Sequence, residues 1–147
     1  MNNRIIIGHI EAINLPELGI RQLPARVDTG AQTSSLHVDN IVQVTKNGKP
    51  AVEFDIHPEM HDVDKIIRCS ARLHDMRKVK SSNGMSEQRY VIKTPAQLGD
   101  HSWDIEVTLT DRSDMTYLML LGRQAISDHF YVDVSQTFIA SESGVQA

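Results

Sequence analysis

Several short segments of the chain alternate between apolar and polar residues, and this pattern predicts β-strands. The clearest is 102–110, where apolar residues occupy every second position from Trp103 to Leu109. Because successive side chains of a strand point to opposite faces, we expect these residues to be buried and the polar residues between them to face water. The same alternation in 51–56, after an Asn47-Gly48 turn, predicts the second strand of a hairpin.

The remaining apolar segments are also short and are separated by turn residues. They predict extended segments at 4–13, 23–28, 35–38, 41–45, 65–73, 76–80, 88–93, 130–134 and 137–140. Residues 117–121 are apolar throughout, which is typical of a strand buried on both faces. Residues 124–129 predict one short helix. The pattern as a whole predicts a mainly β fold, a closed or partly closed barrel with one short C-terminal helix.

Composition adds a domain count and excludes some functions. A chain of 147 residues, 40% hydrophobic and 23% charged, is typical of one soluble globular domain. We expect a single domain over 1–147, with a core at about 5–135 and a frayed tail at 141–147. The net charge of -4 and the pI near 5.9 argue against a general nucleic-acid binder.

The same sequence features predict a cytoplasmic protein. No apolar run approaches the length of a membrane span, and the N-terminal Ile run is too short for a signal-peptide core. Cys69 is the single cysteine, so no internal disulfide can form. This cysteine usage is typical of a reducing compartment.

Asp28-Thr29-Gly30 is the candidate catalytic motif. An Asp at the end of a strand can project its carboxylate into a cleft, the Thr hydroxyl can orient a neighbouring backbone, and the Gly permits close approach. This is the active-site tripeptide of aspartic proteases. Asp-Thr-Gly also occurs in ordinary turns, so the tripeptide alone leaves both interpretations open.

A second segment favours the catalytic interpretation over the ordinary turn. Leu120-Leu121-Gly122-Arg123 stands just before the predicted helix. Together with Val27 to Ala31 it resembles the retropepsins, the single-Asp proteases of the retroviral type, in residue type, order and spacing. The resemblance implies an acid-protease barrel in which Leu121, Gly122 and Arg123 pass beneath the Asp loop and support it.

A bacterial family known as ATP-dependent zinc proteases, or retropepsin-like endopeptidases, is more similar still. Its pattern also includes Ser35-Leu36-His37, Glu87-Gln88-Arg89 and Thr110-Asp111-Arg112. The resemblance covers about 5–135. It leaves two roles open for His37, which either orients the Asp loop or is structural.

The chemistry of an aspartic protease requires two carboxylates close together. Their repulsion and partial burial separate their proton affinities, so that the pair shares one proton and holds one water. The chain contains no second Asp-Thr-Gly or Asp-Ser-Gly. The retropepsin solution is a homodimer in which each subunit gives one Asp, so the resemblance implies that a monomer is inactive.

The hairpin 76–93 lies where retropepsins place the flap that closes over the substrate. The resemblance implies that substrate is contacted by residues of the Asp loop and of this flap: Ala31, Asn83, Gly84, Glu87 and Arg89. An ordinary surface hairpin is the alternative. Two departures from the viral pattern are plain: Gly84 is the one glycine at the tip, and Gln32 stands where the acidic partner of Arg123 is usual.

Residues 65–80 are rich in positive charge. They contain Lys65, Arg68, Arg72, Arg77, Lys78 and Lys80, with Asp75 as the one acid after Lys65. Arg forks bind carboxylates, so Arg68 and Arg72 are candidates for binding an acidic peptide. Members of the family resemble proteins encoded beside ATP-grasp ligases that add glutamates, which implies such a ligase as a functional partner. The alternative is that these cations lie on a solvated surface, where they pair with Asp62, Asp64 or acidic residues of another protomer.

Seven histidines require a test for metal sites. His57 and His61 are four apart, but the intervening Glu59 is one place late for a metalloprotease motif and Pro58 opposes the helix. Cys69 and His74, with Asp62 or Asp64, fit no standard closed zinc site. No Gly-rich phosphate loop is present. We therefore expect neither metal nor cofactor, and we expect Cys69 to be a buried small residue.

The sequence and its resemblance therefore predict an aspartic-type peptidase that acts as a homodimer on a peptide or protein substrate. A glutamate-rich or ligase-modified peptide is the candidate substrate. Two alternatives stay open. One is a non-catalytic peptide-binding barrel of the same fold, and the other is a metal-dependent hydrolase that uses 57–74.

Overall fold

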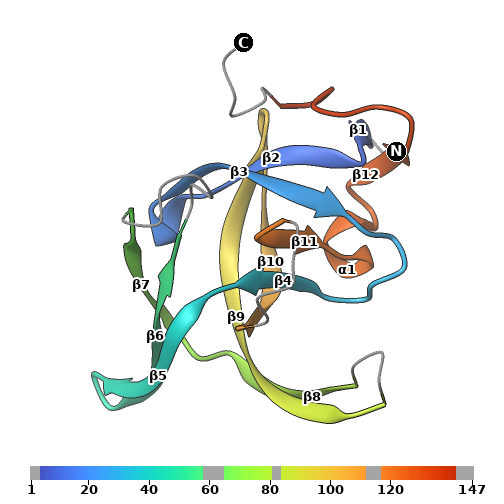
Figure 1. The fold of residues 1–147 in the computed structure, drawn as a ribbon. Helices are drawn as coiled ribbons and strands as arrows, with labels where there is room; N and C mark the ends of the chain where they lie inside the picture. The colour runs from blue at the N-terminus through green and yellow to red at the C-terminus, as the bar shows by residue number, and fades with distance from the viewer. Residues whose placement is uncertain (1–3, 58–64, 81–83, 112–116, 142–147) are drawn as a thin grey trace.

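The computed structural model describes residues 4–57, 65–80, 84–111 and 117–141. Within these ranges the chain consists mainly of short strands (Figure 1). They are β1 (Ile5–Gly8), β2 (Ile10–Leu15), β3 (Ile20–Val27), β4 (Ser34–His37), β5 (Asp39–Lys46), β6 (Lys49–Ile56), β7 (Ile67–Arg72), β8 (Asp75–Lys80), β9 (Ser86–Leu98), β10 (His101–Thr110), β11 (Met119–Leu121) and β12 (Phe130–Asp133), with the helix α1 (Arg123–Ile126) and a 3₁₀ turn η1 (Pro16–Leu18).

Six of these strands close into a mixed barrel in the described part of the chain, in the order β10, β4, β11, β3, β2, β9. The pairing of β9 with β10 closes the circle. The β10–β4 and β11–β3 pairs are parallel, and the other pairs in the barrel are antiparallel. Strand β8 pairs with the start of β9 and extends away from the barrel as a hairpin (Figure 1). The predicted barrel with one short helix is confirmed.

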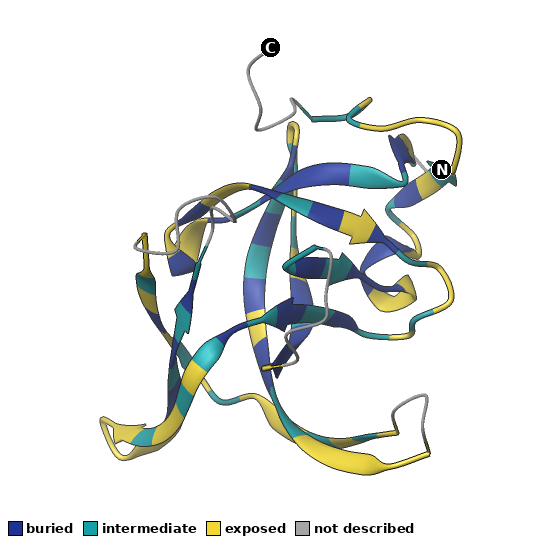
Figure 2. Cartoon of the chain, viewed as in Figure 1, coloured by how far each residue is buried: buried dark blue, intermediate teal, exposed yellow. Residues whose placement is uncertain are grey.

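Two smaller sheets complete the fold. Strands β5, β6 and β7 form an antiparallel sheet at one side of the barrel, and β1 pairs in parallel with β12 near the two chain ends (Figure 1). The core follows the predicted alternation in β6, where Val52, Phe54 and Ile56 are fully buried. Buried residues line the barrel strands, whereas β8 is largely exposed (Figure 2).

The alternation predicted for 102–110 holds in only part of β10. Thr108 and Thr110 were expected to face water, but they are 3% and 4% exposed. The reason is local pairing: this part of β10 lies beside β4, and the Thr108 hydroxyl donates to the carbonyl of Ser34 (3.2 Å). The prediction that 117–121 is buried on both faces also holds only in part. Met119 and Leu121 are buried, whereas Leu118 and Leu120 are half-buried.

The predicted first strand, 4–13, is two strands. The chain turns at Gly8, where a Cβ would lie 2.4 Å from the carbonyl oxygen of Gln136. Only glycine permits this close approach of two backbone segments. The predicted helix 124–129 is also shorter, since α1 ends at Ile126 and Ser127 has extended backbone angles.

The closing strand predicted at 137–140 is absent, and the cause is a buried side chain that the pattern did not reveal. Glu11 on β2 is 0% exposed. Its carboxylate accepts hydrogen bonds from the amides of Gly8 (2.7 Å), Ile139 (3.1 Å) and Ala140 (3.2 Å), and from the hydroxyl of Ser141 (2.5 Å). These donors would otherwise serve a strand ladder. The carboxylate therefore holds the C-terminal segment against β2.

Two further expectations are only partly covered by the structure. The expected frayed tail lies outside the described residues from 142 onward, as does the hairpin tip at 81–83. No helix in the described ranges is long and apolar enough to cross a membrane.

Candidate active site

The Asp28 loop begins where β3 ends and is fixed from below by β11. Strand β11 runs parallel to β3, with Leu121 level with Val27. The amide of Asp28 donates to the carbonyl of Leu121 (2.9 Å), and the amide of Val27 donates to the carbonyl of His9 (2.8 Å). The backbone at the start of the loop is therefore held on one side by β11 and on the other by the segment between β1 and β2.

The carboxylate of Asp28 has a defined orientation. The amide of Gly30 donates to Asp28 Oδ1 (2.9 Å), and the amide of Ala31 donates to the Asp28 carbonyl (3.3 Å). Asp28 is half-buried, while Thr29 and Gly30 are exposed in the single chain. The loop thus presents an oriented carboxylate at an open surface.

Arg123 holds the outer part of this loop through its backbone and its side chain. Its amide donates to the carbonyl of Ala31 (2.7 Å), and its guanidinium Nη1 donates to the carbonyls of Thr29 (3.1 Å) and Gly30 (3.3 Å). The next amide, of Gln124, donates to the carbonyl of Gln32 (2.9 Å). These bonds explain how the loop is held with Gln32 in the place of an acid: the guanidinium binds backbone carbonyls.

Gly122 lies against the backbone that follows the loop. A Cβ at this position would lie 2.7 Å from the carbonyl carbon of Thr33 and 2.8 Å from its oxygen. The Gly122 amide donates to the hydroxyl of Ser34 (3.0 Å), which is 1% exposed. Ser34 was not among the predicted site residues; its signal in the sequence is a serine that directly follows the Asp loop, where its hydroxyl can accept an amide from the opposing strand.

His37 is placed away from the Asp28 carboxylate. The strand register sets it beside Thr110, and its amide donates to the carbonyl of Leu118 (2.7 Å). Because Leu36 pairs with Met119, and Met119 with Ala25, His37 lies several residues along the strand direction from Asp28. Its Nδ1 is buried with no hydrogen-bond partner among the described residues. The geometry favours the structural alternative for His37.

The β8–β9 hairpin is present at the position of the candidate flap. Lys80 pairs with Ser86, and Gly84 has a φ of +84°. Asn83 lies outside the described residues. Arg89 Nε donates to Glu87 Oε1 (2.7 Å), so these two candidate substrate residues bind each other in the single chain.

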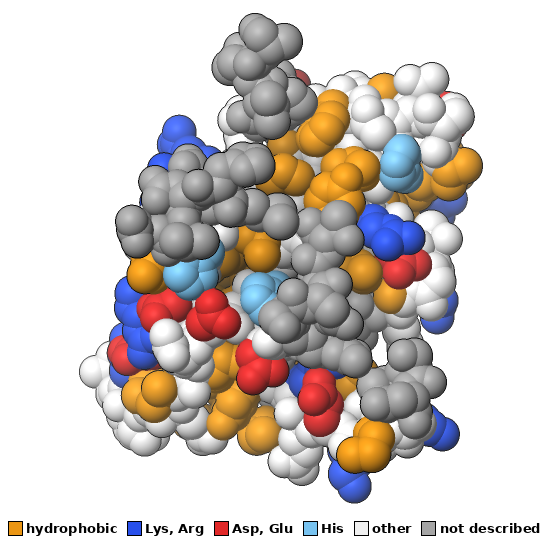
Figure 3. Space-filling model, viewed as in Figure 1, with side chains coloured by type: hydrophobic (Ala, Val, Ile, Leu, Met, Phe, Trp, Pro, Cys, Tyr) orange, Lys and Arg blue, Asp and Glu red, His pale blue; other side chains and the backbone are white. Residues whose placement is uncertain are grey.

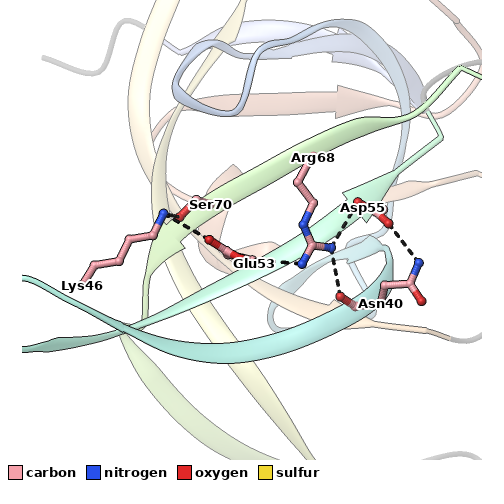
Figure 4. Close-up of polar contacts among 6 residues, drawn as sticks. All are labelled: Asn40, Lys46, Glu53, Asp55, Arg68 and Ser70. Atoms are coloured by element: carbon pink, nitrogen blue, oxygen red, sulfur yellow. Dashed lines mark hydrogen bonds and ion pairs between the residues drawn. The ribbon is translucent and has the colours of Figure 1, made fainter.

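Arg68 and Arg72 lie on β7, across the barrel from the loop that follows β3 (Figure 1). Arg68 donates to Asp55 Oδ1 (3.1 Å) and to the carbonyl of Asn40 (3.1 Å), and its other nitrogen lies 3.7 Å from Glu53 (Figure 4). Hydrogen bonds from Asn40 and Arg68 hold the pKa of Asp55 below its ordinary value. The structure therefore does not bring these two arginines to Asp28, and it engages Arg68 within its own sheet.

The surface carries both acidic and basic side chains, so the basic run at 65–80 does not form an isolated positive patch. On the face shown in Figure 3, acidic side chains lie mainly in the lower half, with histidines beside them on the left, and most of the Lys and Arg side chains visible there lie along the rim. Arg77 is ion-paired with Asp75 and Glu106, whereas Arg72, Lys78 and Lys80 are exposed. Part of the basic run is therefore neutralised within the chain.

The candidate metal ligands do not converge where the structure describes them. His57 Nε2 lies 3.1 Å from Asp39 Oδ2, and no group of three or more His, Cys, Asp or Glu residues in the described ranges could hold a metal ion. His61 and its neighbours in 58–64 lie outside those ranges. Cys69 is 2% exposed, as expected for a buried small residue, and burial, with the charge of Asp55, raises the pKa of its thiol to about 11.

A hollow of about 490 Å³ lies near the start of β3, at the opposite end of that strand from Asp28. Its lining includes Asn14, Arg21, Gln22 and Gln97 but not Asp28. This hollow is therefore separate from the candidate catalytic loop.

Comparison with solved structures finds a similar fold. A protein of unknown function from Legionella pneumophila superposes with a TM-score of 0.78 at 33% identity, over 92% of this chain and 98% of that one. This chain therefore shares its overall fold with an experimentally determined structure.

Curated relatives with similar sequences are much longer proteins. A "Probable alpha-L-glutamate ligase" of Shewanella pealeana is 46% identical over 97% of this chain, and one of Parasynechococcus marenigrum is 43% identical over 90%. The chain spans only 31% of the first relative and 28% of the second.

The match to a family model covers nearly the whole chain. The model for the retropepsin-like aspartic endopeptidase RimB matches residues 6–143, which include the Asp28 loop, the β8–β9 hairpin and the β11–α1 segment. The chain belongs to the RimB-like family of retropepsin-like aspartic endopeptidases.

Proposed function

We propose that this protein is an aspartic-type peptidase that acts as a homodimer, with one Asp28-Thr29-Gly30 motif in each subunit. The observation that carries the proposal is the Asp28 carboxylate itself. The Gly30 amide orients it, Arg123 holds its loop, and the loop is open at the surface of the single chain. Family membership supports the same reaction class.

In the proposed mechanism, a two-fold axis brings the two Asp28 carboxylates together around one water. Like charges at close range cannot both ionise, so the pair carries a single proton. The ionised carboxylate takes a proton from the water as the water attacks the peptide carbonyl, while the protonated one donates its proton to the carbonyl oxygen. The first carboxyl group then gives its proton to the amide nitrogen as the C–N bond breaks. The second carboxylate takes a proton back from one hydroxyl of the adduct, which re-forms a carbonyl and restores the singly protonated pair. The β8–β9 hairpin closes over the peptide and excludes bulk water.

The exposed apolar residues near the chain ends support a location for the dimer interface. Ile6 and Tyr131 pair across β1 and β12 and are 55% and 54% exposed, and Val134 is 75% exposed. The end of β1 leads to His9, whose carbonyl accepts the amide of Val27 beside Asp28. A second copy docked on this sheet would bury apolar surface close to both Asp loops.

For the substrate, we propose a glutamate-rich or ligase-modified peptide. The longer relatives are named as glutamate ligases, and their matching segment corresponds to this chain. A peptidase associated with an ATP-grasp glutamate ligase would act on the product of that ligase, in the cytoplasm where the ligase finds ATP. Arg72, Lys78 and Lys80 are exposed cations able to attract such a peptide.

Salt dependence tests the substrate class. We expect a glutamate-rich peptide to be cleaved with a higher kcat/KM than a neutral peptide of equal length, and we expect added salt to reduce the difference. The combined change Arg72→Ala, Lys78→Ala and Lys80→Ala should lower kcat/KM roughly tenfold for the acidic peptide only. Arg21→Ala removes one cation at the far end of β3 and is the control for a loss of charge away from the hairpin; it should leave the preference for the acidic peptide unchanged. Equal cleavage of both peptides at all salt concentrations would exclude electrostatic selection of an acidic substrate.

A further inference from the structure

The end of α1 is bound by the single tryptophan of the chain. Trp103, on β10, is half-buried, and its Nε1 donates to the carbonyl oxygen of Ala125 (3.0 Å). The last carbonyl groups of a helix have no hydrogen-bond partner within the helix. The indole of Trp103 therefore satisfies an acceptor that this short helix cannot satisfy by itself.

The same helix holds the Asp28 loop at its other end. The guanidinium of Arg123 donates to the carbonyl of Thr29 (3.1 Å), and the amide of Arg123 donates to the carbonyl of Ala31 (2.7 Å). Because α1 spans only four residues, Arg123 and Ala125 lie within one helical turn of each other. A displacement of the helix at Ala125 therefore also moves the residue that binds the loop.

Three aromatic rings surround the indole of Trp103. The ring centroids of His101, His129 and Phe130 lie 5.1, 5.7 and 5.0 Å from that of Trp103. His101 Nε2 and His129 Nδ1 are 2.9 Å apart and share a hydrogen bond. This bond requires one of the two facing nitrogens to carry a proton and the other to accept it. The two histidines therefore hold each other beside the indole as long as one facing nitrogen is unprotonated.

We propose that Trp103 is a positioning residue for the Asp28 loop, which acts through α1, and that the His101–His129 hydrogen bond keeps the indole aligned with the helix. The proposal rests on the proposed function, since it takes the Asp28 carboxylate as the catalytic group. A small displacement of a catalytic group costs much of its rate, so the helix that carries the loop must itself be fixed.

Acid should weaken this support. Burial, and to a smaller extent the charge of His129, lower the pKa of His101, and no other charged group in the described ranges contributes to this shift. The neighbouring carboxylates Asp100 and Asp128 are exposed, and Asp128 is ion-paired with Arg4 (3.3 Å). A lowered histidine pKa means that the folded state binds fewer protons than the unfolded state. The support is therefore complete above the ordinary histidine pKa of about 6.5 and is lost as the pH falls below it.

Trp103→Phe tests the positioning role. Phenylalanine keeps an aromatic ring but removes the donor to Ala125. We expect backbone hydrogen exchange, read by mass spectrometry, to rise about tenfold in both 123–126 and 28–32. The value of kcat should fall about tenfold, while KM should change less than twofold, because the loop is displaced and the substrate contacts of the hairpin remain.

Val52→Ala is the control for a general loss of stability, since Val52 is fully buried on β6, in the β5–β6–β7 sheet. It should leave exchange in 28–32 and the kcat of the folded protein unchanged. A folded Trp103→Phe protein with wild-type exchange in 28–32 would refute the positioning role. If the wild type shows no peptidase activity, the proposed function fails, and the exchange pattern still decides the role of Trp103.

The wild-type protein itself provides a second test, which does not depend on the folding of a Trp103 variant. Trp103 is the single tryptophan, so intrinsic fluorescence reports this cluster alone. Between pH 7 and pH 5 we expect the fluorescence to change, and exchange in 28–32, corrected for its intrinsic pH dependence, to rise over the same range. His101→Gln and His129→Gln should each remove both changes, whereas His57→Gln, on the β6 side of the molecule, should retain them. A pH response that is the same in all four proteins, or no response in the wild type, would refute the role of the histidine pair.

Discussion

Asp28→Asn is expected to abolish peptide cleavage while leaving the protein folded. Asparagine has the same shape as aspartate, and its oxygen can still accept the hydrogen bond from the Gly30 amide. It cannot take a proton from water, and loss of a general base costs at least about 10²-fold in rate. The measurement is kcat/KM on a peptide substrate, accompanied by thermal unfolding to confirm that the fold is retained.

Asp104→Asn is the matched control, because Asp104 is an exposed aspartate on β10. The Asp104→Asn protein should cleave the peptide with the same kcat/KM as the wild type. Activity of Asp28→Asn within a few-fold of wild type would exclude Asp28 as the general base. If neither wild type nor variant cleaves peptides but both bind them equally, the protein is a peptide-binding barrel.

Gly122→Ala is expected to cause the second-largest loss, in both stability and activity. The added methyl would lie 2.7 Å from the backbone of Thr33, so the segment after the Asp28 loop must move. Overpacking of this kind costs about 1–3 kcal/mol in the free energy of unfolding. Because Arg123 and Gln124 bind the same loop, the displacement should also move the Asp28 carboxylate and lower kcat.

Urea unfolding and peptide cleavage measure the two effects of Gly122→Ala. Gly48→Ala serves for comparison, since a Cβ at Gly48 meets nothing within 4 Å and only its φ of +76° is unfavourable for alanine. We expect that variant to lose about 1–2 kcal/mol through backbone strain and to keep full activity. A Gly122→Ala protein with wild-type activity would contradict the tight support assigned to the loop.

The strands and the candidate catalytic loop could be predicted from the sequence because their signals are local. Alternation identified β6 and most of β10, and the Asp-Thr-Gly tripeptide with the Leu-Gly-Arg segment identified the loop and its support. The resemblance to retropepsins implied that Arg123 supports the loop. Its binding to the carbonyls of Thr29 and Gly30 could not be predicted, because backbone acceptors leave no signature in side-chain identity.

The features that could not be predicted depend on contacts between distant segments. Glu11 replaces the expected strand at 137–140 by accepting amides from residues far away in the sequence. The only local signal was a charged residue inside an apolar run. Arg68 similarly appeared as part of a basic run, and its pairing with Asp55 and Glu53 follows from the register of β6 and β7.

Subunit mixing tests whether two Asp28 carboxylates from different chains form one catalytic site. Wild-type chains are allowed to exchange with increasing amounts of Asp28→Asn chains, and activity is measured per wild-type chain. If each site needs two Asp28 carboxylates across a two-fold axis, activity per wild-type chain will fall in proportion to the wild-type fraction, because mixed dimers are inactive. Activity per wild-type chain that stays constant at every ratio, with exchange verified, would contradict the shared site.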